Sequence, residues 1–193
     1  MSKQTWKPGA LLSPVPTAMV TCGSMEKPNI ITIAWTGIIN SQPSMTYISV
    51  RPNRYSYELI KSSGEFAINL TTASLVRAAD YCGVKSGEKT DKFRDMRLTP
   101  IPAAQIAAPL IEESPVSIEC RVTEIKELGS HHMFIANVLC VDVDDRYVDS
   151  KGKLMLHKCS LVAYSHGEYF ELGKRLGTFG FSVKKRSGTK GRA

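Results

Sequence analysis

Apolar and polar residues alternate along most of the chain, and the alternating segments are rich in β-branched and aromatic residues. The alternation predicts seven strands, at Ala18 to Cys22, Ile30 to Trp35, Met45 to Val50, Phe66 to Leu70, Ser117 to Glu127, Met133 to Val143 and Leu161 to Glu171. Short polar segments with the composition of turns separate them, Ser41-Gln42-Pro43 among them. We therefore expect a mostly antiparallel sheet.

Helical signals are fewer and short. Asn53 is placed to cap a helix over Arg54 to Ser62, and Thr72 to cap one over Ala73 to Tyr81 that Gly83 would close. Thr90 to Met96 forms a third candidate. Regular alternation of strand and helix is absent, which favours a closed or split antiparallel β-barrel with a few short helices over a doubly wound sheet.

Composition bounds the number of domains and the partners. The chain has 193 residues, of which 42% are hydrophobic and 22% charged, enough for one substantial core. The net charge is +7, and five positive charges fall in the last ten residues. We therefore expect one domain over residues 1–183 and a basic, disordered tail over 184–193. The rest of the chain is nearly balanced in charge, so a nucleic-acid groove is not indicated.

Targeting signals and cysteine usage point to the cytoplasm. No apolar run approaches the roughly 18 residues of a membrane span, and Pro14 and Pro16 interrupt the one candidate signal-peptide core. The odd number of widely spaced cysteines favours reduced thiols; they are Cys22, Cys82, Cys120, Cys140 and Cys159. His157, Cys159 and His166 lack a second ligand pair, so we expect no metal site.

Several common motifs are absent or incomplete. Residues 83–90 read GVKSGEKT, but Glu88 stands where a Walker loop needs glycine, and no buried strand leads into the segment. The chain contains no GxGxxG, GxSxG or HExxH motif. The sequence therefore does not support a Rossmann dinucleotide site or the commonest classes of hydrolase.

One stretch suits a flat aromatic ligand. Residues 29–60 read NIITIAWTGIINSQPSMTYISVRPNRYSYELI. Trp35 offers an aromatic wall there, and Thr32 and Thr36 offer hydroxyl partners for the amide-like edge of an isoalloxazine ring. A tryptophan in an apolar strand is also ordinary core material, so the pattern alone leaves both interpretations open.

The same stretch suits a phosphate. Arg51, Arg54 and Ser56 gather where the predicted strand at Met45 to Val50 ends and a helix begins. The helix N-terminus adds backbone donors and a favourable dipole. Two arginines and a hydroxyl at one helix start favour phosphate binding over a solvated edge. Ring and phosphate partners together indicate FMN.

Five segments then carry a resemblance. The order NIITIAWTGIINSQPSMTYISVRP, NRYSYELIKSSGEFAINL, KTDKF, LGSHHMFIANV and HGEYFELGKRLGTFG resembles the flavin reductase-like, FMN-binding split-barrel family, and within it the flavoredoxin group. The similarity covers roughly residues 10 to 182. It implies a Greek-key split β-barrel and a homodimer with one FMN bound non-covalently near the dimer interface.

The resemblance also implies particular FMN contacts. They fall on Asn29, Trp35, Ser56, Lys92, His131 and Tyr164. The complete predicted FMN site is Asn29, Thr32, Ala34, Trp35, Thr36, Ser49, Val50, Arg51, Arg54, Ser56, Lys92, His131 and Tyr164. The group tends to have threonine and phenylalanine where this chain has Ser56 and Tyr164, so the hydroxyl and the ring are kept while the flavin potential could differ.

Four functions stay open from sequence. The first is an FMN-dependent redox protein of flavoredoxin type, which exchanges electrons with a ferredoxin-like protein or a small acceptor. The second is an NAD(P)H:flavin oxidoreductase that supplies reduced flavin to a partner. The third is a colourless OB-like barrel that binds nucleic acid through aromatic residues and the basic tail. The fourth is a structural dimer without a ligand.

Overall fold

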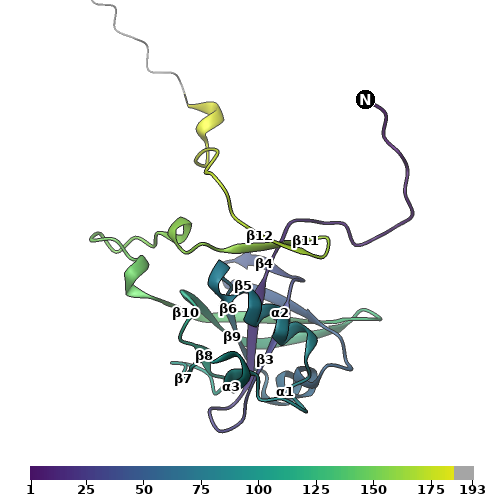
Figure 1. Ribbon diagram of the computed structural model, residues 1–193, viewed down its shortest axis with the longest axis vertical. Helices are drawn as coiled ribbons and strands as arrows, with labels where there is room; N and C mark the ends of the chain where they lie inside the picture. The colour runs from purple at the N-terminus through teal and green to yellow at the C-terminus, as the bar shows by residue number, and fades with distance from the viewer. Residues whose placement is uncertain (185–193) are drawn as a thin grey trace, which may run out of the picture.

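The computed structural model describes residues 1–184, so all of the predicted tail at 184–193 except Lys184 lies outside the described residues (Figure 1). A seven-stranded sheet has the order β3-β2-β6-β9-β10-β5-β4, and all its strand pairs are antiparallel. In chain order its strands are β2 (Ala18–Gly23), β3 (Pro28–Ile33), β4 (Thr36–Ser41), β5 (Ser44–Val50), β6 (Glu65–Leu70), β9 (Val116–Glu127) and β10 (His132–Val143).

Two smaller sheets and three α-helices complete the fold. β1 (Val15–Pro16), β11 (Val162–Ser165) and β12 (Glu168–Glu171) pair in the order β1-β11-β12, and β7 (Pro100–Ile101) pairs with β8 (Leu110–Ile111). The helices are α1 (Tyr55–Ser63), α2 (Val76–Val84) and α3 (Lys92–Met96). The expected mainly β, antiparallel split barrel with a few short helices is confirmed.

The large sheet curls because its two edge strands are neighbours in sequence. Ala34 and Trp35 alone link β3 to β4, and the Ser49 amide donates to the Trp35 carbonyl at 2.9 Å. Trp35 therefore lies at the seam of the barrel rather than inside a strand. Its side chain is 45% exposed, so it is not core material.

β2 and β3 are buried on both faces, because the barrel core lies on one side and helices on the other. Val20 and Ile31 belong to the core cluster that also contains Phe66 and Phe134. Residues of the opposite face, such as Ile30, pack with α2 and α3. Burial on both faces explains why these two segments read as almost continuous apolar runs.

Some predicted boundaries were wrong. The single predicted strand at Leu161 to Glu171 is the hairpin of β11 and β12, and the Ile30 to Trp35 strand ends at Ile33. The hairpin turn places His166 and Gly167 at φ 50° and 95°. Left-handed backbone at a histidine is uncommon, so the sequence gives little sign of this turn.

The predicted helix starts also shift. Arg54, not Asn53, is the N-cap of α1, and no side chain caps it. Thr72 precedes a 3₁₀ turn at Ala73–Leu75 without capping it, and α2 runs past Gly83 to Val84. Asp91 caps α3 by accepting from the Arg94 amide at 3.1 Å, so Thr90 lies outside that helix. None of the helices in residues 1–184 has the length and apolar character that a bilayer crossing requires.

Candidate functional site

A cavity of about 700 Å³ opens between the barrel seam, α2 and the small β1-β11-β12 sheet. Several predicted site residues line it, namely Thr32, Ala34, Trp35, Ser49, Val50, Arg51, Arg54, His131 and Tyr164. The barrel seam brings β3, β5 and the tip of the β9–β10 hairpin to one place, which is why residues from distant parts of the chain meet here. The volume lies within the usual range of small-molecule sites.

Trp35 and His131 form one wall of this cavity. Their ring centroids are 4.3 Å apart and the rings are tilted by 44°. Burial, and then the positive charge of Arg51, lowers the pKa of His131 from its usual 6.5, so the imidazole is mostly neutral at pH 7. The wall is thus a flat, uncharged aromatic surface with an arginine beside it.

A second part of the lining is also aromatic. Tyr164 of β11 packs edge-on against Tyr169 of β12 at 5.5 Å between ring centroids. The Tyr169 hydroxyl donates to Asp80 of α2, and all three residues line the cavity. Two pairs of aromatic rings in the lining suit a planar ligand.

A second, smaller cavity of about 80 Å³ adjoins the large one. The two share Ile31, Arg54 and Gly83, and the Arg54 guanidinium donates to the Gly83 carbonyl at 2.8 Å where they meet. Its remaining lining residues are Asn53, Tyr55, Ser56, Cys82, Lys85, Ser86, Gly87 and Lys92. Three cations and no carboxylate belong to the lining, so the small cavity is strongly electropositive.

Lys92 is the central cation of the small cavity. Its side chain is buried, and Nζ donates to the carbonyls of Ile30 and Cys82 at 2.6 and 2.8 Å. None of the ion pairs found within residues 1–184 includes Lys92. Burial lowers its pKa from 10.5. A buried ammonium without a counter-charge is costly, and an anionic ligand is the simplest compensation.

Hydrogen-bond donors surround the same cavity. The Asn29 amide donates to Ser56 Oγ at 2.7 Å, and both side chains are buried. This bond leaves the Ser56 hydroxyl proton free to donate. The N-terminus of α1 has no side-chain cap. The Arg54 and Tyr57 amides donate to backbone carbonyls, which leaves the N–H groups of Tyr55 and Ser56 available to an anion.

Two predicted contacts have protein partners instead. The Thr36 hydroxyl donates to the Tyr47 carbonyl at 2.6 Å, and Thr36 lines neither cavity. The Thr32 hydroxyl donates to the Ala79 carbonyl, so Thr32 contributes to the large cavity while its proton is already used within the protein. Asn29 lines neither cavity, and it contacts the small cavity only through its hydrogen bond to Ser56.

Sequence reasoning missed two parts of the site. The N-terminal segment supplies Ala10, Leu12, Ser13 and Val15 to the large cavity, although its prolines and lack of periodicity gave no signal. The loop at 85–87 lines the small cavity, although the segment was considered only as a failed Walker loop. Its lysine, serine and glycine content was the available signal.

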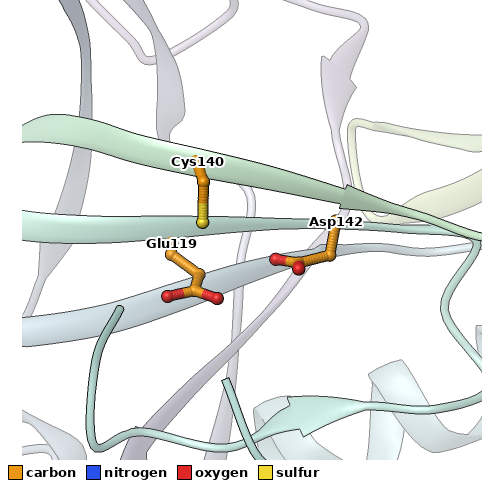
Figure 2. A group of neighbouring side chains, drawn as sticks. All are labelled: Glu119, Cys140 and Asp142. Carbon is orange, nitrogen blue, oxygen red and sulfur yellow. The ribbon is translucent and has the colours of Figure 1, made fainter. Parts of the chain in front are cut away.

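A separate polar cluster lies on β9 and β10 (Figure 2). The ligand atoms of Glu119, Cys140 and Asp142 lie within 4.8 Å of one another, and Figure 2 shows the two carboxylates side by side. Glu119 is fully buried and accepts the amides of Ala104 and Gln105, both at 2.7 Å. These two bonds give Glu119 a structural role, and we assign no metal to the cluster.

Cys140 and Asp142 lie beside that carboxylate, and its charge makes both of them harder to deprotonate. Burial, and then the charge of Glu119, raises the pKa of Asp142 and brings that of Cys140 to about 11. In residues 1–184 no other group of three metal-ligating side chains is this close, so His157, Cys159 and His166 do not converge.

Comparisons with known proteins agree with this architecture. Residues 11–173 match the family model of the flavin reductase-like domain. The chain therefore belongs to the flavin reductase-like domain family.

Two solved structures and one curated relative are especially informative. Flavoredoxin of Desulfovibrio vulgaris (Miyazaki F) has a TM-score of 0.88 and 32% identity, covering 95% of this chain and 100% of its own. Flavoredoxin from Methanosarcina acetivorans has a TM-score of 0.86, 25% identity and the same coverage. An NADPH-flavin oxidoreductase of Streptomyces viridifaciens is 27% identical over 65% of each chain.

Proposed function

We propose that the protein binds FMN non-covalently, with the ring in the large cavity and the phosphate in the small one. The observation that carries the proposal is the buried ammonium of Lys92, which has no ion-pair partner within residues 1–184 and lies with Arg54 and Lys85 in the lining of a cavity of about 80 Å³. A phosphate of nearly two negative charges supplies the missing counter-charge. The aromatic walls of the adjoining cavity suit the ring.

The resulting function is a redox protein of flavoredoxin or flavin reductase type. Bound FMN would supply hydride and single-electron chemistry. The residues of the small cavity would hold the phosphate, and Trp35 and Tyr164 would contact the ring in the large cavity. Arg51, which also lines the large cavity, would stabilise an anionic reduced ring. Within residues 1–184 the chemistry of the cavity favours no particular electron donor.

The visible spectrum of the purified protein tests this proposal. We expect a yellow protein that releases FMN on denaturation, and an apoprotein that takes up FMN more tightly than riboflavin. Trp35→Ala and Lys92→Ala should both weaken retention of the pigment. A colourless protein that refuses added FMN would exclude the proposal, and full retention in both variants would remove these residues from the site.

Two versions of the function differ in their electron donor. Similarity to flavoredoxins supports an electron carrier, and the NADPH-flavin oxidoreductase relative supports a reductase that uses a nicotinamide. Stopped-flow bleaching of the bound flavin by NADH or NADPH, compared with bleaching by reduced ferredoxin, separates them. Rapid bleaching by NADH or NADPH alone would indicate the reductase, and rapid bleaching by reduced ferredoxin alone would indicate the electron carrier.

We further propose a homodimer in the cytoplasm. All five cysteines are free, which fits a reducing compartment. The nucleic-acid alternative predicts a colourless protein whose binding weakens steeply with salt and depends on residues 184–192. A salt titration with RNA and DNA examines it directly.

A further inference from the structure

The turn of the β11–β12 hairpin places a histidine at the large cavity. The two strands pair as far as Ser165 and Glu168, so His166 and Gly167 alone form the turn, and their φ angles are 50° and 95°. Two-residue turns with positive φ at both positions favour asparagine, aspartate or glycine at the first position. His166 takes that position instead and lines the large cavity. The hairpin therefore keeps an imidazole at the cavity where asparagine would suit the backbone better.

The surroundings of His166 are apolar and open to water. β1 pairs with β11, so the N-terminal segment passes beside the hairpin, and its Leu12 and Val15 join the cavity lining (Figure 1). Tyr164 lies in the same lining, two residues before His166. His166 itself is exposed, so it stands at the mouth of the cavity, where water can return a proton to it.

Most other titratable groups of the lining are engaged or keep one charge. Asp80 accepts the Tyr169 hydroxyl at 3.1 Å. Burial, and then this bond, raises the pKa of Tyr169 to about 12. Tyr164 packs its ring edge-on against Tyr169. Arg51 and Arg54 stay protonated, because a guanidinium does not lose its proton in a protein.

The two histidines of the lining differ in their partners. Nδ1 of His131 lies 3.0 Å from Ser130 Oγ, and burial lowers the pKa of His131. No side-chain hydrogen bond or ion pair within residues 1–184 includes the imidazole of His166, unlike those of His131 and His132. Glu168 follows the turn but lines neither cavity. His166 is therefore the lining group best suited to deliver a proton near neutral pH.

We propose that His166 is the general acid in the reduction of a small, flat enone, a carbonyl group conjugated to a carbon–carbon double bond. This proposal rests on the proposed FMN binding. The β-carbon of the enone receives a hydride from the reduced cofactor, and the π electrons shift toward the carbonyl oxygen. That oxygen takes a proton from the His166 imidazolium, which gives an enol. The enol becomes the saturated ketone in water, and water returns a proton to His166.

The need for a proton distinguishes this acceptor class from others. A one-electron acceptor takes electrons without a proton, and a nicotinamide donor gives its hydride without one. An enone that gains a hydride develops negative charge on oxygen, which a positioned acid neutralises. Its flat, apolar body also fits a cavity mouth that Leu12, Val15 and Tyr164 line.

Anaerobic oxidation of the photoreduced protein tests the proposal. Benzylideneacetone serves as the enone and ferricyanide as the one-electron acceptor. His166→Asn removes the acid but places a residue that the turn favours, so the variant should fold. We expect this variant to react about 100-fold more slowly with benzylideneacetone and at an unchanged rate with ferricyanide. His157→Asn is the matched control, because His157 is exposed and lines neither cavity.

The pH dependence of the enone reaction gives a second readout. In the wild type the rate with benzylideneacetone should fall as pH rises between about 5 and 8, where histidine loses its proton. His166→Asn should lose this dependence, while any contribution from His131 remains in both proteins. An equal pH dependence in the two proteins, or equal slowing with both acceptors, would overturn the role of His166.

Nuclear magnetic resonance of the oxidised protein gives a readout without turnover. The imidazole signal of His166, assigned by its absence in His166→Asn, should shift when benzylideneacetone is added, and that of His157 should not. An unshifted His166 signal would overturn the proposal.

The colour of the protein separates this inference from the proposed function. A colourless wild type that refuses FMN would overturn both. A yellow wild type whose reduced form leaves benzylideneacetone unchanged, or reduces it equally well without His166, would overturn this inference alone.

Discussion

The Tyr169 hydroxyl donates a hydrogen bond of 3.1 Å to Asp80 Oδ1, which joins β12 to α2 across one wall of the large cavity. Burial, and then the bond to Asp80, raises the pKa of Tyr169 to about 12, so the phenol keeps its proton throughout the neutral range. Tyr164 packs edge-on against Tyr169. The bond therefore fixes the hairpin that presents Tyr164 to the cavity.

We expect Tyr169→Phe to weaken FMN binding severalfold, because the ring stays but the hairpin loses its attachment to α2. Loss of the bond should cost about 1 kcal/mol of stability. Fluorescence titration with FMN and thermal unfolding measure the two effects. Tyr81→Phe is the matched control, since Tyr81 donates to Asp95 at 2.9 Å and lines neither cavity. Equal losses of FMN affinity in both variants would contradict the role assigned to Tyr169.

Lys92→Met should weaken FMN binding roughly thirtyfold, because a charge-assisted hydrogen bond to phosphate contributes about 2 kcal/mol. Binding of riboflavin, which lacks the phosphate, should change little. Isothermal titration of both ligands measures the contrast. Lys89→Met removes an exposed lysine nearby and should leave both affinities unchanged. Equal losses for FMN and riboflavin would place Lys92 near the ring instead of the phosphate.

The depressed pKa of Lys92 predicts opposite pH effects on stability and binding. Between its folded-state pKa and 10.5 the unfolded chain holds more protons than the folded one, so the Lys92 contribution to the stability of the apoprotein rises with pH. FMN affinity falls over the same window, because the phosphate needs the ammonium. Denaturant unfolding and FMN titration at several pH values measure both trends. The buried thiols of Cys22, Cys82 and Cys120 have raised folded-state pKa values, so their contribution to stability falls with pH in the same range. The Lys92 contribution is therefore the difference between the wild type and Lys92→Met, and a difference that does not grow with pH would contradict this account.

Most of the fold followed from periodicity, with exceptions that have physical causes. The strand β4 was not predicted, since Thr36–Ser41 is mixed in polarity and mostly exposed, which removes the alternation that marks a half-buried strand. Trp35 was expected inside a strand because apolar residues precede it. The seam of the barrel exposes it instead, and seam geometry depends on strands that are far apart in sequence.

The site was less predictable than the fold. Local pattern indicated Arg54 and Ser56, because a helix start carries its own sequence signal. Lys92, His131 and Tyr164 came from the family resemblance alone, and the structure places all three at cavity walls. The 85–87 loop has only its composition as a sequence signal, because its place at the small cavity depends on the packing of Gly87 against Asn29 and Tyr55, which are far away in the sequence.

Glu119 offers a prediction outside the cavities. Its carboxylate accepts two backbone amides at 2.7 Å, so Glu119→Gln would turn an amide NH₂ toward one of these donors. Leaving buried groups unpaired costs about 1–3 kcal/mol, and we expect a loss of that size in urea unfolding.

The raised pKa of Asp142 means that this neighbour of Glu119 holds its proton more readily than a free carboxyl does. Asp142→Asn imitates the protonated form and should therefore cost much less. An equal cost for the two variants would show that Asp142 is ionised and that a cation, rather than a shared proton, balances the pair. Addition of a chelator or of Zn²⁺ should accordingly leave the unfolding midpoint of the wild type unchanged.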